Sequence, residues 1–389
     1  MSVYHWLVVL VMVLALLMHG ERKRNVKYIL IITVLMFGVC GLRDAYTIGA
    51  DSASSYLHEF ERMKDEKWED LPGFSDWLMG EQNNSEERTG HGRSFGLSWL
   101  MKIVYDWTEG NYQWVVSVIA AFVMLSVAQL VYRFSSNPLQ SFLYFFGLMI
   151  YVLHFSILKQ SAAMGFVLLS FNAIIDRKPF WFVLLVSVAS IFHFPALVFL
   201  PAYWIANINI EKGYLFLLAV LFLLTYAFRD QLLGWMTDTY ETAVYEYEGV
   251  SFLANKVIVM LVIIVAALVI RPPSVEDRIY CALLQIIGVA AVIQTFSSYN
   301  NTFERLADYY FQFAIVFIPM VFENVKTKRA HMSQRELKIV RQIGPYVFCA
   351  FAIWRFLNGV TNNPTLFPHQ FYFQAEKAEE TLALWLSLL

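Results

Sequence analysis

Apolar segments long enough to cross a lipid bilayer recur along almost the whole chain, and they restrict its fold more than any other feature. A spanning helix needs about 20 consecutive, mostly apolar residues, because its backbone groups must form their hydrogen bonds within the segment. Charged residues make up only 15% of the 389 residues, too few to cover a water-soluble globule. We therefore predict a single all-α domain, residues 1–389, built as a polytopic bundle of about 10–12 transmembrane helices.

Short polar stretches separate the predicted spans, and two further segments are ambiguous. The spans lie near 3–18, 28–42, 112–132, 139–156, 158–175, 213–228, 255–270, 279–296, 304–322 and 343–358. Segment 94–107 is amphipathic and short for a span, and segment 180–205 is interrupted near its middle by His193 and Pro195. Proline and a polar side chain inside an apolar run favour a break in the helix.

The distribution of Lys and Arg orients the bundle, because loops rich in these residues stay in the cytoplasm. The loops 19–27 and 323–342 are both rich in them. If 94–107 lies in the membrane interface, 180–205 must cross twice, or enter and return, with its break beside Pro195. If 94–107 spans instead, several basic residues move to the outer side. The first arrangement keeps more positive charge inside and is the one we predict.

This arrangement places two long loops outside the membrane and one basic loop, 323–342, in the cytoplasm. The first outer loop, 43–111, is acidic and includes the interfacial helix, and the second, 229–254, combines carboxylates with many tyrosines. The net charge of −2 gives no case for a nucleic-acid partner. The three cysteines lie inside apolar runs without CxxC spacing, and no metal or nucleotide motif is present. We expect neither a metal nor a cofactor.

The first polar cluster follows the second span and begins with Arg43-Asp44. A guanidinium group offers a planar set of donors that suits phosphate oxygens. Gly49 permits a tight turn that would direct Asp51 back toward the mouth of the bundle. Tyr56 ends the cluster. The structural alternative is an arginine at the membrane interface that pairs with Asp44.

A second cluster begins the span 304–322. Arg305, Asp308 and Tyr309 are spaced by three and four residues, so on a helix they share one face. Their functional interpretation is a second cation for a phosphate-bearing ligand. The structural alternative is an ion pair within the helix.

Two further polar sites interrupt apolar runs. Lys159-Gln160 lies between two predicted spans, where the lysine is either an inward-facing cation or the end of an external turn. His193 could accept a proton from a substrate hydroxyl, since histidine titrates near neutral pH. Its structural alternative is a histidine that only bonds a neighbouring group.

In order and spacing, the four clusters resemble the EpsG-like family of exopolysaccharide polymerases, which are related in role to Wzy-type polymerases. The matching patterns are Arg-x5-Gly-x-Asp-x4-Tyr from Arg43, Lys-Gln at 159–160, Phe-His-x-x-Ala-Leu from Phe192, and Arg-x3-Tyr-Tyr-Phe from Arg305. The resemblance covers roughly residues 40 to 315. The sequence departs from the family pattern in having Lys159 where arginine is usual, and Phe194-Pro195 after the histidine.

The resemblance implies a glycosyltransferase that joins undecaprenyl-diphosphate-linked oligosaccharides into exopolysaccharide, O-antigen or capsule at the outer face of the bacterial inner membrane. A GT-C-like arrangement is its candidate architecture. Flippase and chain-length regulator proteins are candidate partners besides the membrane lipid. Two alternatives are a flippase or transporter of the same lipid-linked sugars, and a membrane acyltransferase that decorates the polymer.

The resemblance also suggests a role for each polar residue. The diphosphate, whose negative charge grows as it leaves, would be bound by Arg43, Arg305 and Lys159. The base that receives the proton of the incoming hydroxyl would be His193 or Asp51. The remaining side chains of the clusters are predicted to contact substrate; they are Asp44, Tyr56, Gln160, Asp308 and Tyr309.

Overall fold

The fold is all-α in the part of the chain that the structure, a computed structural model, describes. The described residues are 2–18, 22–74, 95–208, 220, 222–228, 231, 256–270, 277–297, 301–322 and 333–374. Among them, β pairing is limited to one isolated bridge between Arg43 and Phe371. The predicted helical class is confirmed.

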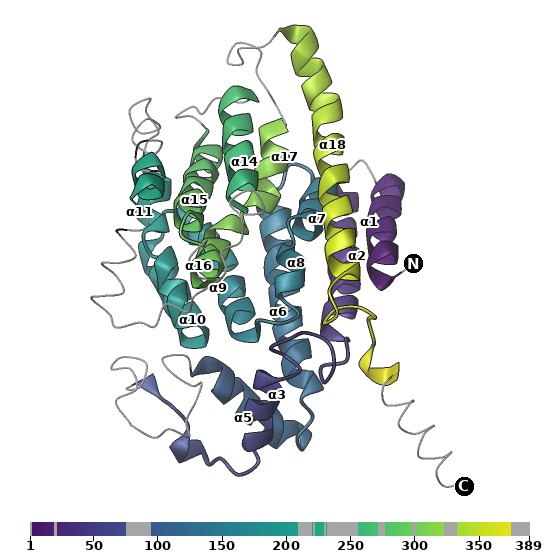
Figure 1. Ribbon diagram of the computed structural model, residues 1–389, viewed down its shortest axis with the longest axis vertical. Helices are drawn as coiled ribbons and strands as arrows, with labels where there is room; N and C mark the ends of the chain where they lie inside the picture. Colours follow the sequence, from purple (N-terminus) through teal and green to yellow (C-terminus); the bar gives the residue numbers. More distant parts are fainter. Residues whose placement is uncertain are drawn as a thin grey trace.

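Most helices run side by side along the long axis, and α3 and α5 lie together beneath them (Figure 1). We call the end of the bundle next to α3 and α5 the lower end, and the opposite end the upper end. The α-helices are α1 (Val3–Met18), α2 (Arg22–Gly41), α3 (Ser55–Arg62), α5 (Gly96–Thr108), α6 (Gln113–Phe134), α7 (Pro138–Gly147), α8 (Ile150–Leu153), α9 (Leu158–Ile175), α10 (Pro179–Phe192), α11 (Ala202–Asn207), α14 (Lys256–Ile270), α15 (Arg278–Gln294), α16 (Asn301–Phe311), α17 (Ala314–Phe322) and α18 (Gln334–Thr361), with 3₁₀ helices η1 (Trp68–Asp70) and η2 (Phe194–Phe199).

Within the described residues, three helical segments are long and apolar enough to cross a membrane, and α16 with α17 adds a fourth if the bent pair counts as one span. The three are α6, α9 and residues 342–361 of α18. Shorter apolar helices, among them α1, α10, α14 and α15, pack beside them. Together these helices make the chain a membrane protein.

Two predicted spans are interrupted in the structure. The segment 139–156 divides into α7 and α8, because Met149 adopts a left-handed backbone with φ of +64°. The segment 304–322 divides into α16 and α17, and the helix axis bends by 48° between them. Each interruption leaves backbone groups outside the regular helical pattern, which a membrane protein tolerates where other helices cover them.

The ambiguous segment 180–205 breaks where the proline predicts it. His193 ends α10 in an extended conformation, and Pro195 lies in the first turn of η2, where its missing N–H costs nothing. The chain then reverses direction. The guanidinium of Arg278 donates to the Asn207 side chain at 2.9 Å and to the Ile174 carbonyl at 3.1 Å, so α11 ends beside the upper end of α9.

The second half of the predicted basic loop 323–342 is helical, because α18 begins at Gln334, and residues 323–332 lie outside the described residues. Ser333 and Glu336 form a capping box, in which each side chain accepts from the other residue's backbone N–H. The predicted outer loop 43–111 carries α3 as well as the predicted helix at 94–107, which is α5. The loop 229–254, apart from Gln231, and half of the predicted span 213–228 lie outside the described residues.

The segment after α18 holds the loop after α2 in place. Gly49 N–H donates to the Thr365 carbonyl at 2.9 Å, and Asp44 N–H donates to the Gln370 carbonyl at 2.9 Å. Gly49 has φ of +99°, and an added Cβ would overlap the Phe155 carbonyl oxygen. The turn that carries Asp51 is therefore fixed by backbone contacts from two distant parts of the chain.

Replacement of Gly49 tests whether this turn is as constrained as it looks. We expect Gly49→Ala to destabilise the protein by on the order of 2 kcal/mol, because its left-handed backbone and the overlap with Phe155 both oppose a Cβ. Gly38→Ala in α2 is the control, since an added Cβ there meets nothing within 4 Å. Thermal unfolding in detergent compares the two. Equal unfolding temperatures would contradict the constraint.

Candidate functional site

Asp51 and Arg305 come together at the lower end of the bundle. The Gly49 turn carries Asp51, and α16 carries Arg305; Asp51 Oδ2 lies 3.9 Å from Arg305 Nη2. The two side chains are 40% and 45% exposed. A pair this open to solvent gives little stability, so its partners can exchange at small cost. Arg305 is thus a cation that an outside anion can reach.

His193 contacts α16 at Tyr309, about one helical turn beyond Arg305. Its Nδ1 lies 2.7 Å from the Tyr309 hydroxyl oxygen, and the Tyr309 side chain is fully buried. When the ring carries its proton on Nδ1, it donates to Tyr309 and leaves Nε2 as a proton acceptor. The break at Pro195 brings the imidazole to the end of α10, so a buried phenol orients it.

Lys159 and Gln160 open α9 and also reach this region. Lys159 Nζ lies 3.2 Å from Glu59 Oε2 of α3, and 5.7 Å from the centre of the Tyr56 ring. Gln160 Nε2 donates to the backbone carbonyl of Arg305 at 2.9 Å. The predicted inward-facing cation is thus held by a nearly buried carboxylate, and Gln160 fixes the backbone that carries Arg305.

Asp308 pairs with a lysine that the sequence reading did not select. Lys256, the first residue of α14, lies 2.8 Å from Asp308 Oδ1 and 2.9 Å from Glu304 Oε1. Lys256 and Asp308 are both buried, whereas Glu304 is 35% exposed. An isolated charge is costly away from water, so the three groups depend on one another.

Arg43 and Asp44 lie behind the turn rather than in the open part of the site. The Arg43 guanidinium is fully buried and donates to the carbonyls of Cys40, Ile48 and Phe155. Asp44 accepts from the Tyr46 N–H and the Thr47 hydroxyl. In this structure Arg43 stabilises the loop, and its predicted contact with diphosphate would require those bonds to exchange.

Four charged residues of this region were missed by the sequence reading: Lys256, Glu304, Glu59 and Arg355. Glu304 stood within the Arg305 cluster, but its partner is distant in sequence. The sequence could have identified Lys256, because this lysine begins an apolar run directly after the second predicted outer loop. Arg355 lies inside the segment of α18 that is long and apolar enough to cross a membrane, and it interacts electrostatically with Glu304; a charge within such a segment is itself a sign of function.

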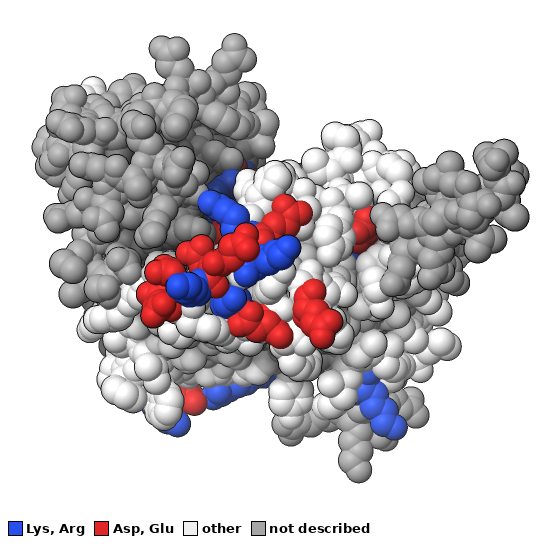
Figure 2. Space-filling view, turned by 90° about the horizontal axis from the view of Figure 1, so that it is seen from below, with Lys and Arg blue, Asp and Glu red and all other residues white. Residues whose placement is uncertain are grey.

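The assembled site mixes cations with carboxylates. The surface of the lower end, seen from below in Figure 2, likewise carries Lys and Arg side chains among Asp and Glu. Among the described residues, no three His, Cys, Asp or Glu side chains are placed to hold a metal ion. The groups present offer Arg305 as a cation that an outside anion can reach, and His193 or Asp51 as candidate proton acceptors, whereas Lys159 is engaged by Glu59.

Comparison with known proteins identifies one family. The family model described as the EpsG family matches residues 26–371. No curated protein and no solved structure gives a significant match. The matched range includes every residue of the site described above, and also the segment that binds the Gly49 turn.

Removal of Lys256 tests the interdependence of the buried charges. We expect Lys256→Met to destabilise the protein by about 3–5 kcal/mol, because it leaves Asp308 as an unpaired buried carboxylate. Lys67→Met is the control, since Lys67 and Glu69 are 74% and 77% exposed. Adding Asp308→Asn to Lys256→Met should recover much of the loss. Unfolding in detergent measures the stability of all three variants. A Lys256→Met variant as stable as the wild type would refute the interpretation.

Proposed function

We propose that this chain, which belongs to the EpsG family, is a polysaccharide polymerase that joins lipid-linked oligosaccharides in the bacterial inner membrane. The family implies an exopolysaccharide-related polymerase. Our proposal adds the substrate, a polyprenyl-diphosphate-linked oligosaccharide, and the place, the outer face of the membrane. The observation that carries it is the half-exposed Arg305 beside Asp51, on the helix whose Tyr309 orients His193.

The distribution of charge supports an outer position for the lower end. Basic residues stand at the upper end of several helices, where α2 begins at Arg22, α6 ends near Arg133 and α9 is followed by Arg177. Loops rich in Lys and Arg stay in the cytoplasm. The site is then open to the compartment in which a lipid-linked sugar would be polymerised, and the protein crosses the membrane many times.

The proposed reaction transfers a glycan chain from one lipid carrier to the terminal sugar of another. The acceptor hydroxyl oxygen forms a bond to the anomeric carbon of the donor glycan. The bond from that carbon to the diphosphate oxygen breaks, and the diphosphate keeps the electron pair. The hydroxyl proton passes to a base. Each step therefore requires either a cation for the departing diphosphate or an acceptor for the proton.

Different parts of the bundle provide the cation for the diphosphate and the acceptor for the proton. Arg305 has a guanidinium that is open to an outside anion, and Lys159 provides a second positive charge from α9. We assign the base to His193, because its Nε2 can accept while Nδ1 bonds Tyr309. Asp51 is the second candidate, since its pairing with Arg305 would end when the guanidinium turns to diphosphate. Arg43 acts on this site by holding the turn.

A transporter of lipid-linked sugars is the second candidate function. The break at His193 and the bend between α16 and α17 favour it, because transporters often place their substrate between broken helices. A transporter would use Arg305 to hold diphosphate but would form no bond. The side of the membrane on which substrate accumulates separates the two functions.

Loss of Arg305 should stop lengthening of the polymer. In Arg305→Ala, we expect single repeat units to accumulate on the lipid carrier in the outer leaflet, because the departing diphosphate loses its main cation. Arg62→Ala, which removes an exposed arginine of α3, is the control. Gel analysis of lipid-linked glycans measures chain length, and protein level in the membrane is checked in parallel. Polymer of normal length from Arg305→Ala would reject the role, and units trapped in the inner leaflet would indicate transport.

Replacement of His193 should slow the transfer without preventing substrate binding. We expect His193→Gln to reduce the rate of polymerisation by about 100-fold or more, the usual loss when a general base is removed. Tyr309→Phe should have a smaller effect, since it removes only the group that orients the ring. Polymerisation by purified protein, together with binding of the lipid-linked unit, tests this. Full activity of His193→Gln beside an inactive Asp51→Asn would move the base to Asp51.

A further inference from the structure

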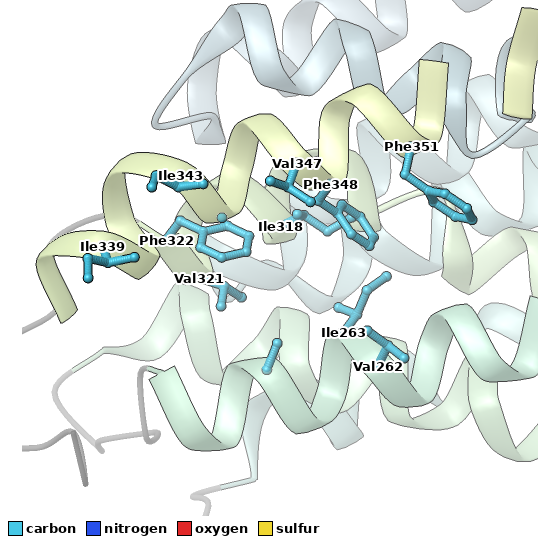
Figure 3. A pocket seen from close by; sticks show the side chains of 12 residues that line it. Val262, Ile263, Ile318, Val321, Phe322, Ile339, Ile343, Val347, Phe348 and Phe351 are labelled. Atoms are coloured by element: carbon cyan, nitrogen blue, oxygen red, sulfur yellow. The ribbon is translucent and has the colours of Figure 1, made fainter. Parts of the chain in front are cut away.

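An apolar groove opens between α14, α17 and α18. Its volume is about 660 Å³, and Phe322, Phe348 and Ile263 lie in the space between the three helices (Figure 3). All of the lining residues are aliphatic or aromatic, or glycine. Phe322, Phe348 and Phe351 supply rings, and residues such as Ile263, Ile318 and Val347 supply branched aliphatic groups. A groove of this kind within membrane helices suits a hydrocarbon chain.

The face of α18 that lines the groove continues to a cation. Gly344, Phe348 and Phe351 line the groove, and together with Arg355 they are spaced by four, three and four residues, so they share a face of the helix. Arg355 lies one turn, about 6 Å, below Phe351 toward the lower end. It interacts electrostatically with Glu304, the partly exposed carboxylate of the charged cluster. The lower end of the groove thus reaches the charged residues of the site.

The other two walls have the same polarity. On α14, Lys256 lies at the lower end and Val262, the first lining residue, lies about 9 Å above it. The bent pair α16–α17 carries Glu304 in its lower part, and Ile318 and Val321 in its upper part. Each wall therefore joins a charged lower part to an apolar upper part, which is the polarity of a lipid with an ionised head group.

We propose that this groove binds the polyprenyl chain of the lipid-diphosphate substrate, with Arg355 next to the head group. The inference rests on the proposed function and names the place of its lipid. The length of the groove favours a polyprenyl chain over the acyl chain of an ordinary phospholipid. From Arg355 to Ile339, α18 rises about 24 Å, whereas one leaflet of a bilayer provides about 15 Å of hydrocarbon. An ordinary acyl chain of the outer leaflet would end near the middle of the groove, and a polyprenyl chain continues beyond it.

A photoreactive probe tests where the chain lies. The full-length protein is placed in nanodiscs of phosphatidylethanolamine and phosphatidylglycerol with an undecaprenyl diphosphate that carries a diazirine at the end farthest from the diphosphate. After illumination, mass spectrometry maps the labelled peptides. We expect label on α18 near Ile339 and Ile343. A short isoprenyl diphosphate with the same tag should label α18 nearer Phe351 and Arg355.

Two adjacent residues of α14 provide matched variants. Ala266 lines the groove, and Val265, which does not, is 58% exposed. Ala266→Trp should reduce the labelling of α18 about tenfold, because the indole must be displaced before the chain can enter. Val265→Trp adds the same ring to the outer surface and should label like the wild type. Val347→Trp, which fills the groove from α18, gives a second test if Ala266→Trp does not fold.

The outcomes separate this inference from the proposed function. Labelling requires no sugar transfer, so an unchanged polymer in Arg305→Ala would reject the polymerase site without deciding the labelling result. Equal labelling in wild type and in both groove variants would overturn the inference. It would also be overturned if a diazirine-tagged phosphatidylglycerol labelled the same peptides and excess phosphatidylglycerol displaced the polyprenyl probe, since the groove would then be a phospholipid site.

Discussion

The pairing of Lys256 with Asp308 and Glu304 is the interaction on which the lower end of the bundle depends. Charged groups in membrane helices are costly unless they meet partners. Here one lysine at the start of α14 satisfies two carboxylates of α16. The residues that follow each carboxylate, Arg305 and Tyr309, contact Asp51 and His193 instead. One short helix therefore distributes four polar side chains among distant parts of the chain.

A second framework fixes the turn that carries Asp51. The guanidinium of Arg43 satisfies carbonyl groups that the loop after α2 leaves without helical partners. The segment after α18 binds the same loop from outside through backbone hydrogen bonds. Because Gly49 leaves no room for a side chain, the position of Asp51 is determined by backbone rather than by side-chain packing. The site thus has a rigid wall on one side and exposed, exchangeable groups on the other.

Patterns within short stretches of sequence predicted the helices and the helix break correctly. The apolar runs predicted α6, α9 and α14 closely, and Pro195 predicted the break at His193. The sequence reading missed pairings that depend on distant residues, such as Lys256 with Asp308, because no local spacing connects a helix start with another helix 52 residues away. It also placed Arg43 with the ligand-binding cations, since the carbonyl groups that enclose it become visible only when the loop is folded. Apolar patterns within one stretch of the chain predict each helix. The site forms where the ends of separate helices meet, and no single stretch of sequence contains that information.

In the proposed polymerase, cations from separate helices surround one diphosphate at the lower end of the bundle. A cryo-electron microscopy structure of the full-length protein in nanodiscs with undecaprenyl diphosphate would show whether they do. We expect phosphate density within hydrogen-bond distance of Arg305, with Lys159 or Arg355 as a second contact and Asp51 released from its pair. Diphosphate density on another face of the protein, with the Asp51–Arg305 pair unchanged, would show that these cations do not bind the substrate.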